Sequence, residues 1–291
     1  MKTKKERLNM SKPVVITADS TVDLSPELLA RYDVKIIPLT VILGDSSFLD
    51  GHDFTPYDMY QRYHADGTLP KTAAPSIQDF YDFFRQYTEA GFAVVHLDIS
   101  SELSNAYNAA RLAAGELEGV YVIDSRMLST GVGLLAIEAA ECREKGMSAP
   151  EIAGHLEELK HKVSTSFVLD TLEFMWKGGR CTGVTAFGAN LLKIKPALEM
   201  RDGKLEIYKK YRGNINNVYR QYITEKLEGK QIRPGHIFLT ESGEIDPAVI
   251  ASLEKLVQSL SGCREVHYTV AGSTISYHCG PKCLGVLFIE A

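Results

Sequence analysis

The chain has 291 residues, of which 45% are hydrophobic and 24% charged, and its formal net charge is −5. This mild acidity argues against nucleic-acid binding, because proteins that bind a phosphate backbone need a concentrated basic surface. The apolar runs are too short to cross a bilayer, which argues against an integral membrane protein. The length is more typical of two domains than of a single hydrophobic core.

The N-terminal residues and the cysteines indicate in which cellular compartment the protein is expected. We expect residues 1–12 to form a disordered polar arm, and no apolar segment typical of a secretory signal follows them. The five cysteines are an odd number scattered through a large chain, which is typical of a reducing environment rather than of a disulfide framework. We therefore expect a cytoplasmic protein.

The first half of the chain alternates strands and helices. Strands rich in Val, Ile and Leu are predicted at 14–18, 34–43, 93–99 and 120–123. Helices are predicted to start at capping residues, namely Ser25, Thr55, Ser76, Ser104, Ser129 or Thr130, and Ser148. This order predicts a doubly wound parallel sheet, in a Rossmann-like α/β domain over 13–162. The polar segment 19–23 follows the first strand, where open α/β sheets place their sites.

From residue 163 the pattern changes to that of an α+β domain, predicted over 163–291. Asp202-Gly203 lies between two strand-like runs and is the strongest hairpin signal in the chain. The other predicted elements are strands at 164–171, 236–239, 266–270 and 284–289, helices at 172–179, 185–193, 214–227 and 247–260, and a loop at 271–282.

The stretch 93–110 predicts an anion site. Its apolar strand ends at Ser100 and Ser101, and helix-forming residues resume after Ser104. Backbone N–H groups, the positive end of the helix dipole and serine hydroxyls converge at such a junction. These residues alone leave open whether the anion is a phosphate or a carboxylate.

Two motifs have plainer explanations than the ones they suggest. Residues 131–136 match the G-x-G-x-x-A pattern of dinucleotide sites, but they follow a late strand, so we favour helix packing over a nucleotide-binding regulator. His278, Cys279 and Cys283 offer too few ligands, at the wrong spacing, for a closed zinc site or a redox motif, so we expect no metal. His278 in its polar loop and Arg212 after the hairpin are each either functional or simply exposed.

A series of short motifs, taken in order, resembles the DegV family of bacterial lipid-binding proteins from about Val14 to Ile289. Each motif is weak alone, but their order is specific. They are D-S-T-x-D-L at 19–24, a T-S-Q-P-S-like loop at 72–76, an S-S-x-L-S-G-like turn at 100–105, K-G-G-R at 177–180, L-K-I-K-P at 192–196, D-G at 202–203 and I-S-x-H at 275–278.

This resemblance implies a function and a set of site residues. It implies a protein without enzymatic activity or cofactor that binds one long-chain fatty acid and presents its carboxylate to a separate fatty acid kinase, which forms the acyl phosphate. It implies that Thr72 and Ser104 bind the carboxylate, and that His278 and Arg212 support the head group or face the kinase. The domain at 163–291 is expected to form much of the tunnel for the acyl tail, with the 185–193 helix and the strand containing Phe167 and Leu169 as candidates.

Two departures from the family pattern and one rival function stay open. Ala73-Ala74 replaces Ser-Gln and Asn105-Ala106 replaces Gly-Thr, which leaves both expected carboxylate ligands in place but puts the acyl preference in doubt. Asn tolerates left-handed backbone, so the turn at 105 can survive without Gly. The rival is an esterase-like hydrolase with Ser104 as nucleophile and His278 as base, although the chain lacks a G-x-S-x-G elbow.

Overall fold

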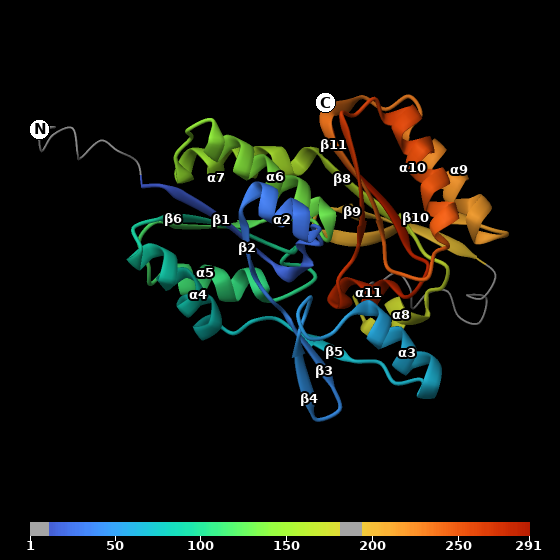
Figure 1. Ribbon diagram of the computed structural model, residues 1–291, viewed down its shortest axis with the longest axis horizontal. Helices are drawn as coiled ribbons and strands as arrows, with labels where there is room; N and C mark the ends of the chain where they lie inside the picture. Colours follow the sequence, from blue (N-terminus) through green and yellow to red (C-terminus); the bar gives the residue numbers. More distant parts are fainter. Residues whose placement is uncertain (1–11, 181–193) are drawn as a thin grey trace, which may run out of the picture.

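The computed structural model describes residues 12–180 and 194–291, and the strands of this part of the chain form three β-sheets (Figure 1). The arm predicted at 1–12, apart from Lys12, and the helix predicted at 185–193 lie outside the described residues. Within the described ranges, no helix is both long enough and apolar enough to cross a membrane.

The first sheet is parallel, in the strand order β2-β1-β6-β7. Helices α4 and α5 pack on one face and α6 and α7 on the other, as Figure 1 shows. The predicted doubly wound arrangement is therefore confirmed. The bounds are β1 (Val14–Asp19), β2 (Val34–Ile37), β6 (Ala93–Asp98), β7 (Val120–Asp124), the 3-10 helices η1 (Ser20–Val22) and η2 (Lys160–Lys162), α2 (Pro26–Tyr32), α3 (Pro56–Asp66), α4 (Ile77–Glu89), α5 (Ala106–Ala114), α6 (Thr130–Glu144) and α7 (Ala149–Leu159).

Local capping chemistry explains where several of these helices begin. Ser25 accepts a hydrogen bond from the backbone N–H of Leu28, and Pro26 occupies the first turn, where its missing N–H costs nothing. Thr55, Ser76 and Ser148 each form a complete capping box with the acidic residue three positions later. The predicted starts at these four caps are confirmed.

The second sheet is mixed, in the strand order β10-β9-β8-β13-β11-β12, and only the β11–β12 pair is parallel. Asp202 and Gly203 form the predicted turn between β9 and β10, with positive φ at both residues. Helices α9 and α10 pack against this sheet, which confirms the α+β pattern. The bounds are β8 (Val163–Val168), β9 (Lys195–Arg201), β10 (Lys204–Tyr211), β11 (Ile232–Glu241), β12 (Glu265–Val270), β13 (Leu284–Glu290), α8 (Glu173–Gly178), α9 (Ile215–Leu227), α10 (Pro247–Ser261) and α11 (Ser273–Cys279).

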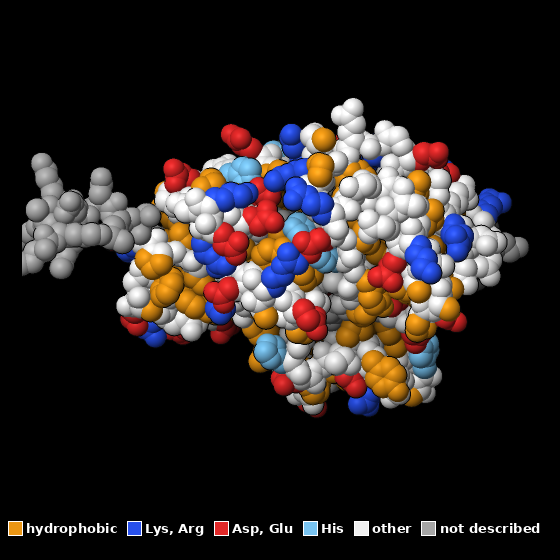
Figure 2. All heavy atoms as spheres, turned by 45° about the horizontal axis from the view of Figure 1, so that its top comes forward, with side chains coloured by type: hydrophobic (Ala, Val, Ile, Leu, Met, Phe, Trp, Pro, Cys, Tyr) orange, Lys and Arg blue, Asp and Glu red, His pale blue; other side chains and the backbone are white. Residues whose placement is uncertain are grey.

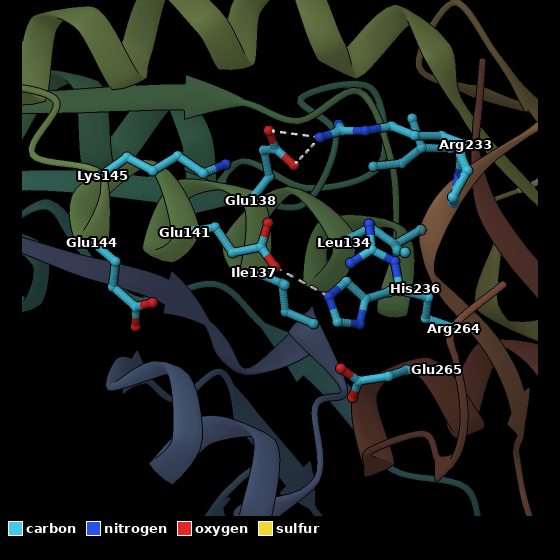
Figure 3. A pocket seen from close by; sticks show the side chains of 13 residues that line it. Leu134, Ile137, Glu138, Glu141, Glu144, Lys145, Arg233, His236, Arg264 and Glu265 are labelled. Carbon is cyan, nitrogen blue, oxygen red and sulfur yellow. Dashed lines mark hydrogen bonds and ion pairs between the residues drawn. The ribbon is translucent and has the colours of Figure 1, made fainter.

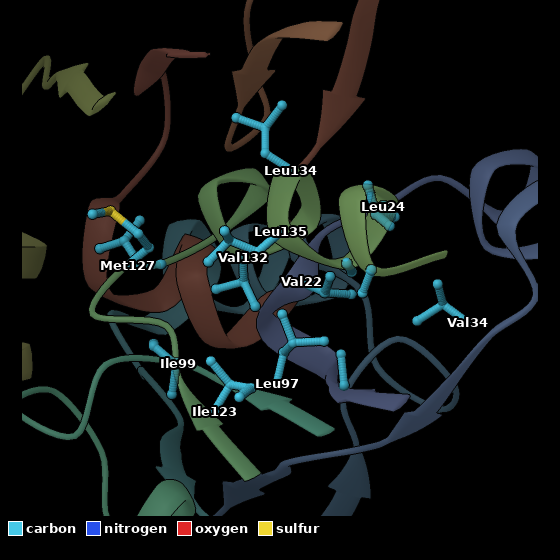
Figure 4. Packing of buried hydrophobic residues seen from close by; sticks show 14 of the residues in the cluster. Val22, Leu24, Val34, Leu97, Ile99, Ile123, Met127, Val132, Leu134 and Leu135 are labelled. Atoms are coloured by element: carbon cyan, nitrogen blue, oxygen red, sulfur yellow. The ribbon is translucent and has the colours of Figure 1, made fainter. Parts of the chain in front are cut away.

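Helix α6 lies between the first and second sheets and contacts β1, β6, β8, β11 and β13. Its two glycines allow this close packing. A Cβ at Gly131 would lie 2.3 Å from Thr165 Oγ1, and one at Gly133 would lie 2.8 Å from a methyl group of Leu24. The packing interpretation of the G-x-G-x-x-A motif is therefore confirmed. Figure 4 shows α6 side chains packed among residues of the first sheet and its loops in one continuous core.

The third sheet is small and antiparallel, in the order β4-β3-β5, with bounds β3 (Thr40–Leu43), β4 (Ser46–Leu49) and β5 (Lys71–Ala73). The single strand predicted at 34–43 is wrong: β2 ends at Ile37, and β3 begins after Pro38 in a different sheet. Proline has no N–H for a strand ladder, which favours a break there. Val41 of β3 and Tyr60 of α3 share a hydrophobic cluster with Phe174 of α8 and Tyr277 of α11, and α11 contacts both α3 and α8.

Candidate ligand site

A small cavity, here called the α11 cavity, lies where the third sheet, the N-terminal end of α5 and helix α11 meet. Its volume is about 60 Å³. Thr72, Ser104 and His278 all line it, although they come from three distant parts of the chain. Arg180 and Thr274 also line it, and the remaining lining residues are mostly apolar. Arg212 is exposed just after β10 and does not line the cavity.

His278 is held in the α11 cavity by its surroundings. Its Nε2 lies 3.4 Å from Thr72 Oγ1, at the long end of a hydrogen bond, and its Nδ1 is buried without a partner among the described residues. Burial, and then the positive charge of Arg180, lower the pKa of His278 to about 3. The imidazole is therefore neutral at physiological pH, so it can donate one N–H to a ligand without carrying charge.

The K-G-G-R motif shapes the wall opposite His278. A Cβ at Gly178 would lie 2.3 Å from His278 Nδ1, so only glycine leaves room for the ring. Gly179 caps α8 with φ +67°, and Arg180 follows with its guanidinium donating to the carbonyl oxygen of Gly178 at 2.8 Å. Arg180 was absent from the expected site residues, although the motif contains it. It supplies the positive charge that the other lining residues lack.

Helix α11 replaces the loop predicted at 271–282, which is wrong over 273–279. Asp23 accepts a hydrogen bond from the N–H of Gly272 at 2.8 Å, and Asp50 accepts one from the N–H of Ser273 at 2.9 Å. These carboxylates satisfy free N–H groups at the start of a helix and complement its dipole. Because both lie more than 200 residues away in the chain, no local pattern announces this helix.

The polar residues after β1 position α11 rather than line the cavity. Asp19 accepts from the N–H groups of Thr21 and Ile99, and burial together with Asp98 raises its pKa to about 7. Ser20 donates to Asp50, and burial raises the pKa of Asp50 above its ordinary value. The D-S-T-x-D-L segment therefore fixes the carboxylates that hold α11, and through α11 it fixes His278.

The serines of the 93–110 stretch have different tasks. Ser100 donates to the carbonyl oxygen of Gly203 in the β9–β10 turn, and Ser101 donates to Asp124. Ser104 lines the cavity, and its hydroxyl accepts from the N–H of Ala106 at 3.2 Å. The N-cap is Asn105, so the prediction of Ser104 as the helix cap is wrong by one residue. Ser104 nonetheless lies beside the N-terminus of α5, as the anion-site prediction requires.

The α11 cavity continues toward the second sheet. A further space of about 20 Å³, the inner cavity, shares the lining residues Leu128, Phe167, Ile275 and Cys279 with it. The walls of this pair of cavities are largely apolar, with Leu287 and Cys283 farther in. Phe167 is one of the residues predicted for an apolar tunnel, and it lines both cavities. Leu169, the other residue predicted on that strand, is buried but lines neither.

The geometry offers little to an esterase. Ser104 and His278 line the same cavity, but within the described residues they share no hydrogen bond, and His278 faces Thr72 instead. No carboxylate orients the imidazole, since Nδ1 has no partner there. A triad needs a base that is bonded to the nucleophile and oriented by a third group. The arrangement suits hydrogen-bonding to an anion better than proton abstraction.

Comparison with known proteins agrees with this architecture. A family model described as "Uncharacterised protein, DegV family" matches residues 13–291. The chain belongs to the DegV family. A relative from Thermotoga maritima, named fatty acid-binding protein, is 32% identical over 284 residues that cover 94% of this chain and 96% of that protein. A DegV domain-containing protein of Clostridium perfringens is 29% identical over 290 residues, covering 97% and 99% of the two chains.

Solved DegV structures share the whole fold. One from Thermus thermophilus, described as showing fatty acid binding of a DegV family protein, has a TM-score of 0.86 at 31% identity and covers 96% of this chain and all of its own. Another, described as a stearic acid-binding protein from Eubacterium ventriosum, has a TM-score of 0.81 at 27% identity and covers 94% and 97% of the two chains. The mixed α/β architecture is therefore common to these DegV proteins.

Proposed function

We propose that this protein binds one long-chain fatty acid, with its carboxylate in the α11 cavity and its acyl tail directed through the inner cavity. The observation that carries the proposal is a change in polarity: the donors Thr72, Ser104, Arg180 and His278 line one end, whereas two thirds of the residues that line the inner cavity are apolar or glycine. The polar residues of the inner cavity are Ser129, Thr240, Glu241 and Ser242. The fatty acids named for the Thermus and Eubacterium relatives support the same ligand class.

The donors of the α11 cavity suit a carboxylate. Two hydroxyl groups, a neutral imidazole N–H and a guanidinium offer charge-assisted hydrogen bonds to its two oxygens. The start of α5 beside Ser104 adds a favourable dipole. At about 0.8 kcal/mol per buried methylene, a sixteen-carbon tail contributes on the order of 10 kcal/mol gross, so the tail supplies affinity and the head group supplies orientation.

Binding a long tail requires the walls to move apart. The two cavities measure about 60 and 20 Å³, whereas sites for drug-sized ligands are roughly 300 Å³ or more. The shared walls at Phe167, Ile275 and Cys279 separate as the tail enters, so part of the binding energy is used to open the core.

We further propose that the bound carboxylate is presented to a separate fatty acid kinase in the cytoplasm, and that this chain is not itself an enzyme. Arg180 is exposed, and Thr72 and Ser104 are half-buried, so a carboxylate among them is reachable from outside. Arg212, exposed beyond β10, is available for the kinase-facing role. The four described cysteines are free thiols, which supports a reducing compartment.

Native mass spectrometry of gently purified protein tests the ligand, and a co-purified fatty acid is the expected result. In titrations with a fluorescent fatty acid, Arg180→Ala should weaken binding about tenfold and Thr72→Ala or Ser104→Ala by a smaller factor, because each removes one donor. Arg212→Ala is the matched control for loss of a surface arginine and should bind normally. A protein that neither carries nor takes up fatty acid refutes the proposal, and ester hydrolysis lost in Ser104→Ala supports the hydrolase instead.

A further inference from the structure

A larger cavity lies elsewhere, between the C-terminal part of α6 and the starts of β11 and β12. This junction pocket has a volume of about 540 Å³ and shares no lining residue with the α11 cavity. Acidic, basic and histidine side chains lie intermixed on the face that Figure 2 draws. Its lining includes Glu138, Glu141, Glu144, Arg233, His236 and Glu265, all of which Figure 3 labels.

Three potential metal ligands meet beside the junction pocket: His236 and Glu265, which line it, and His267, which does not. In the parallel β11–β12 pair His236 is opposite Glu265, and Phe238 is opposite His267, so the three side chains extend from the same sheet face. His236 Nδ1 lies 2.9 Å from His267 Nε2, and that Nε2 lies 3.7 Å from Glu265 Oε2. One ligand atom from each residue falls within 4.8 Å of the others.

A second, independent feature is that the other ring nitrogen of His236, Nε2, also has polar partners. Its Nε2 lies 3.3 Å from Glu141 Oε1 and 3.4 Å from the Tyr32 hydroxyl. Figure 3 shows Glu141 pointing at one side of the imidazole and Glu265 lying on the other. Histidines that bind metals usually donate their second ring N–H to a carboxylate, which fixes the tautomer and leaves the other nitrogen free as a ligand.

We propose that His236, His267 and Glu265 form a binding site for a divalent transition metal of the zinc type. Two nitrogens bound to one tetrahedral zinc ion lie about 3.3 Å apart, since each Zn–N bond is about 2.0–2.1 Å. The observed 2.9 Å needs to open by only a few tenths of an ångström. Two imidazoles, one carboxylate and a water molecule complete a four-coordinate site, which is the ligand set of an open zinc centre.

Neighbouring charges set the cost of occupying this site. Arg31 holds both oxygens of Glu265, at 2.6 and 2.9 Å, so the metal must share this carboxylate with a guanidinium that is 53% exposed and free to swing away. Arg233 is already paired with Glu138 at 2.9 Å.

Calorimetric titration of the untagged full chain with zinc ion tests the site, and one ion per chain with a raised melting temperature is expected. His236→Gln and His267→Gln should each lower the affinity at least about a hundredfold, since each removes a ligand, and Glu141→Gln about tenfold, as losses of such outer partners do. His161→Gln changes an exposed histidine away from the cluster and should bind zinc normally.

Cobalt(II) in place of zinc separates this site from sulfur-containing alternatives. Two imidazoles and a carboxylate give cobalt d–d absorption without a thiolate charge-transfer band. A thiolate band, or binding that is lost in Cys142→Ser and kept in His267→Gln, would assign the metal to the Glu138–Cys142–His155 group and overturn the proposal. Absence of binding, or equal binding in all variants, would also overturn it. Glu265→Gln replaces any histidine variant whose circular dichroism shows that it does not fold.

Discussion

The α11 cavity is small and mainly apolar, whereas the junction pocket is large and lined by many charged side chains. The α11 cavity holds about 60 Å³ between mainly apolar walls, and its His278 has a buried nitrogen without a partner in the described part of the chain. The junction pocket holds about 540 Å³, and several of its charged side chains are paired across it, as Glu138 is with Arg233 and Glu141 with His236. Volume alone would have chosen the junction pocket as the place for an acyl chain.

This difference shows that the apolar surface of a cavity, rather than its volume, determines whether the cavity binds an apolar ligand. A tail gains free energy only from apolar surface that it removes from water, and ion-paired walls offer little of it. The open, charged pocket suits a small hydrated cation, whereas the tight apolar cavity suits a chain that opens it. The following changes separate the two assignments.

The largest expected effect comes from blocking the wall that the α11 and inner cavities share. Cys279→Phe adds an aromatic ring where Cys279 lines both, so we expect fatty-acid affinity to fall a hundredfold or more. Overpacking should cost about 1–3 kcal/mol of unfolding free energy. Zinc affinity of the same variant, measured by calorimetry, serves as the internal control and should be unchanged. Fatty-acid affinity within twofold of the wild type would place the tail elsewhere.

An intermediate effect is expected from Gly178→Ala. The added methyl group would lie 2.3 Å from His278 Nδ1, so the ring must shift, and fatty-acid affinity should fall about tenfold. Gly154→Ala is the matched control, because this helical glycine has nothing within 4 Å of the added methyl group. It should bind normally and gain up to about 1 kcal/mol of stability. Equal affinities for the two variants would remove His278 from the head-group site.

The smallest effect on fatty-acid binding is expected from two carboxyl groups that do not line the α11 cavity, and these groups give the stability pH dependences of opposite sign. Burial and Asp98 raise the pKa of Asp19 to about 7, so Asp19 contributes stability that is present near pH 4 and is lost toward pH 7, at most about 1.4 kcal/mol per pH unit. Burial tends to raise the pKa of Glu138, but hydrogen bonds from Arg233 and His155 outweigh it and lower the pKa. Glu138 therefore contributes stability that is present at neutral pH and is lost on acidification.

Urea unfolding at about pH 4 and about pH 7 measures both contributions. The difference in unfolding free energy between the wild type and Asp19→Asn should be larger at the lower pH, because only the wild type gains that proton on folding. The difference between the wild type and Glu138→Gln should be larger at the higher pH. Two differences that change in the same direction would contradict the assigned pKa shifts.

Much of the fold was predictable because its causes are local. Strand and helix alternate in the first half, and capping residues such as Thr55 and Ser76 satisfy N–H groups only three positions away. The break at Pro38 was also readable in principle, since proline interrupts a ladder. Helix α11 was not, because the carboxylates that cap it, Asp23 and Asp50, belong to another part of the chain.

The residues of the candidate site also divide into those that local sequence motifs predict and those that only the tertiary structure identifies. The motif series pointed to Thr72, Ser104 and His278, and the structure brings these three residues to one cavity. Their role as ligands of a carboxylate stays a prediction. The sequence does not single out Arg180, because an arginine after two glycines has no distinctive local pattern. Only the contact of His278 with Gly178 explains why glycine is needed just before Arg180. Arg212 lies outside the cavity, and its kinase-facing role stays a prediction.

The two carboxylates that cap α11 also determine when this part of the fold can form during protein synthesis. Asp23 and Asp50 are synthesised long before Gly272 and Ser273, with which they pair across 249 and 223 positions. Strand β13, which fills the middle of the second sheet between β8 and β11, follows later still. A nascent chain on the ribosome therefore has no complete α11 cavity until these last elements emerge, and contacts of such long sequence separation form slowly. The proposed loading with fatty acid would consequently be a step that follows translation.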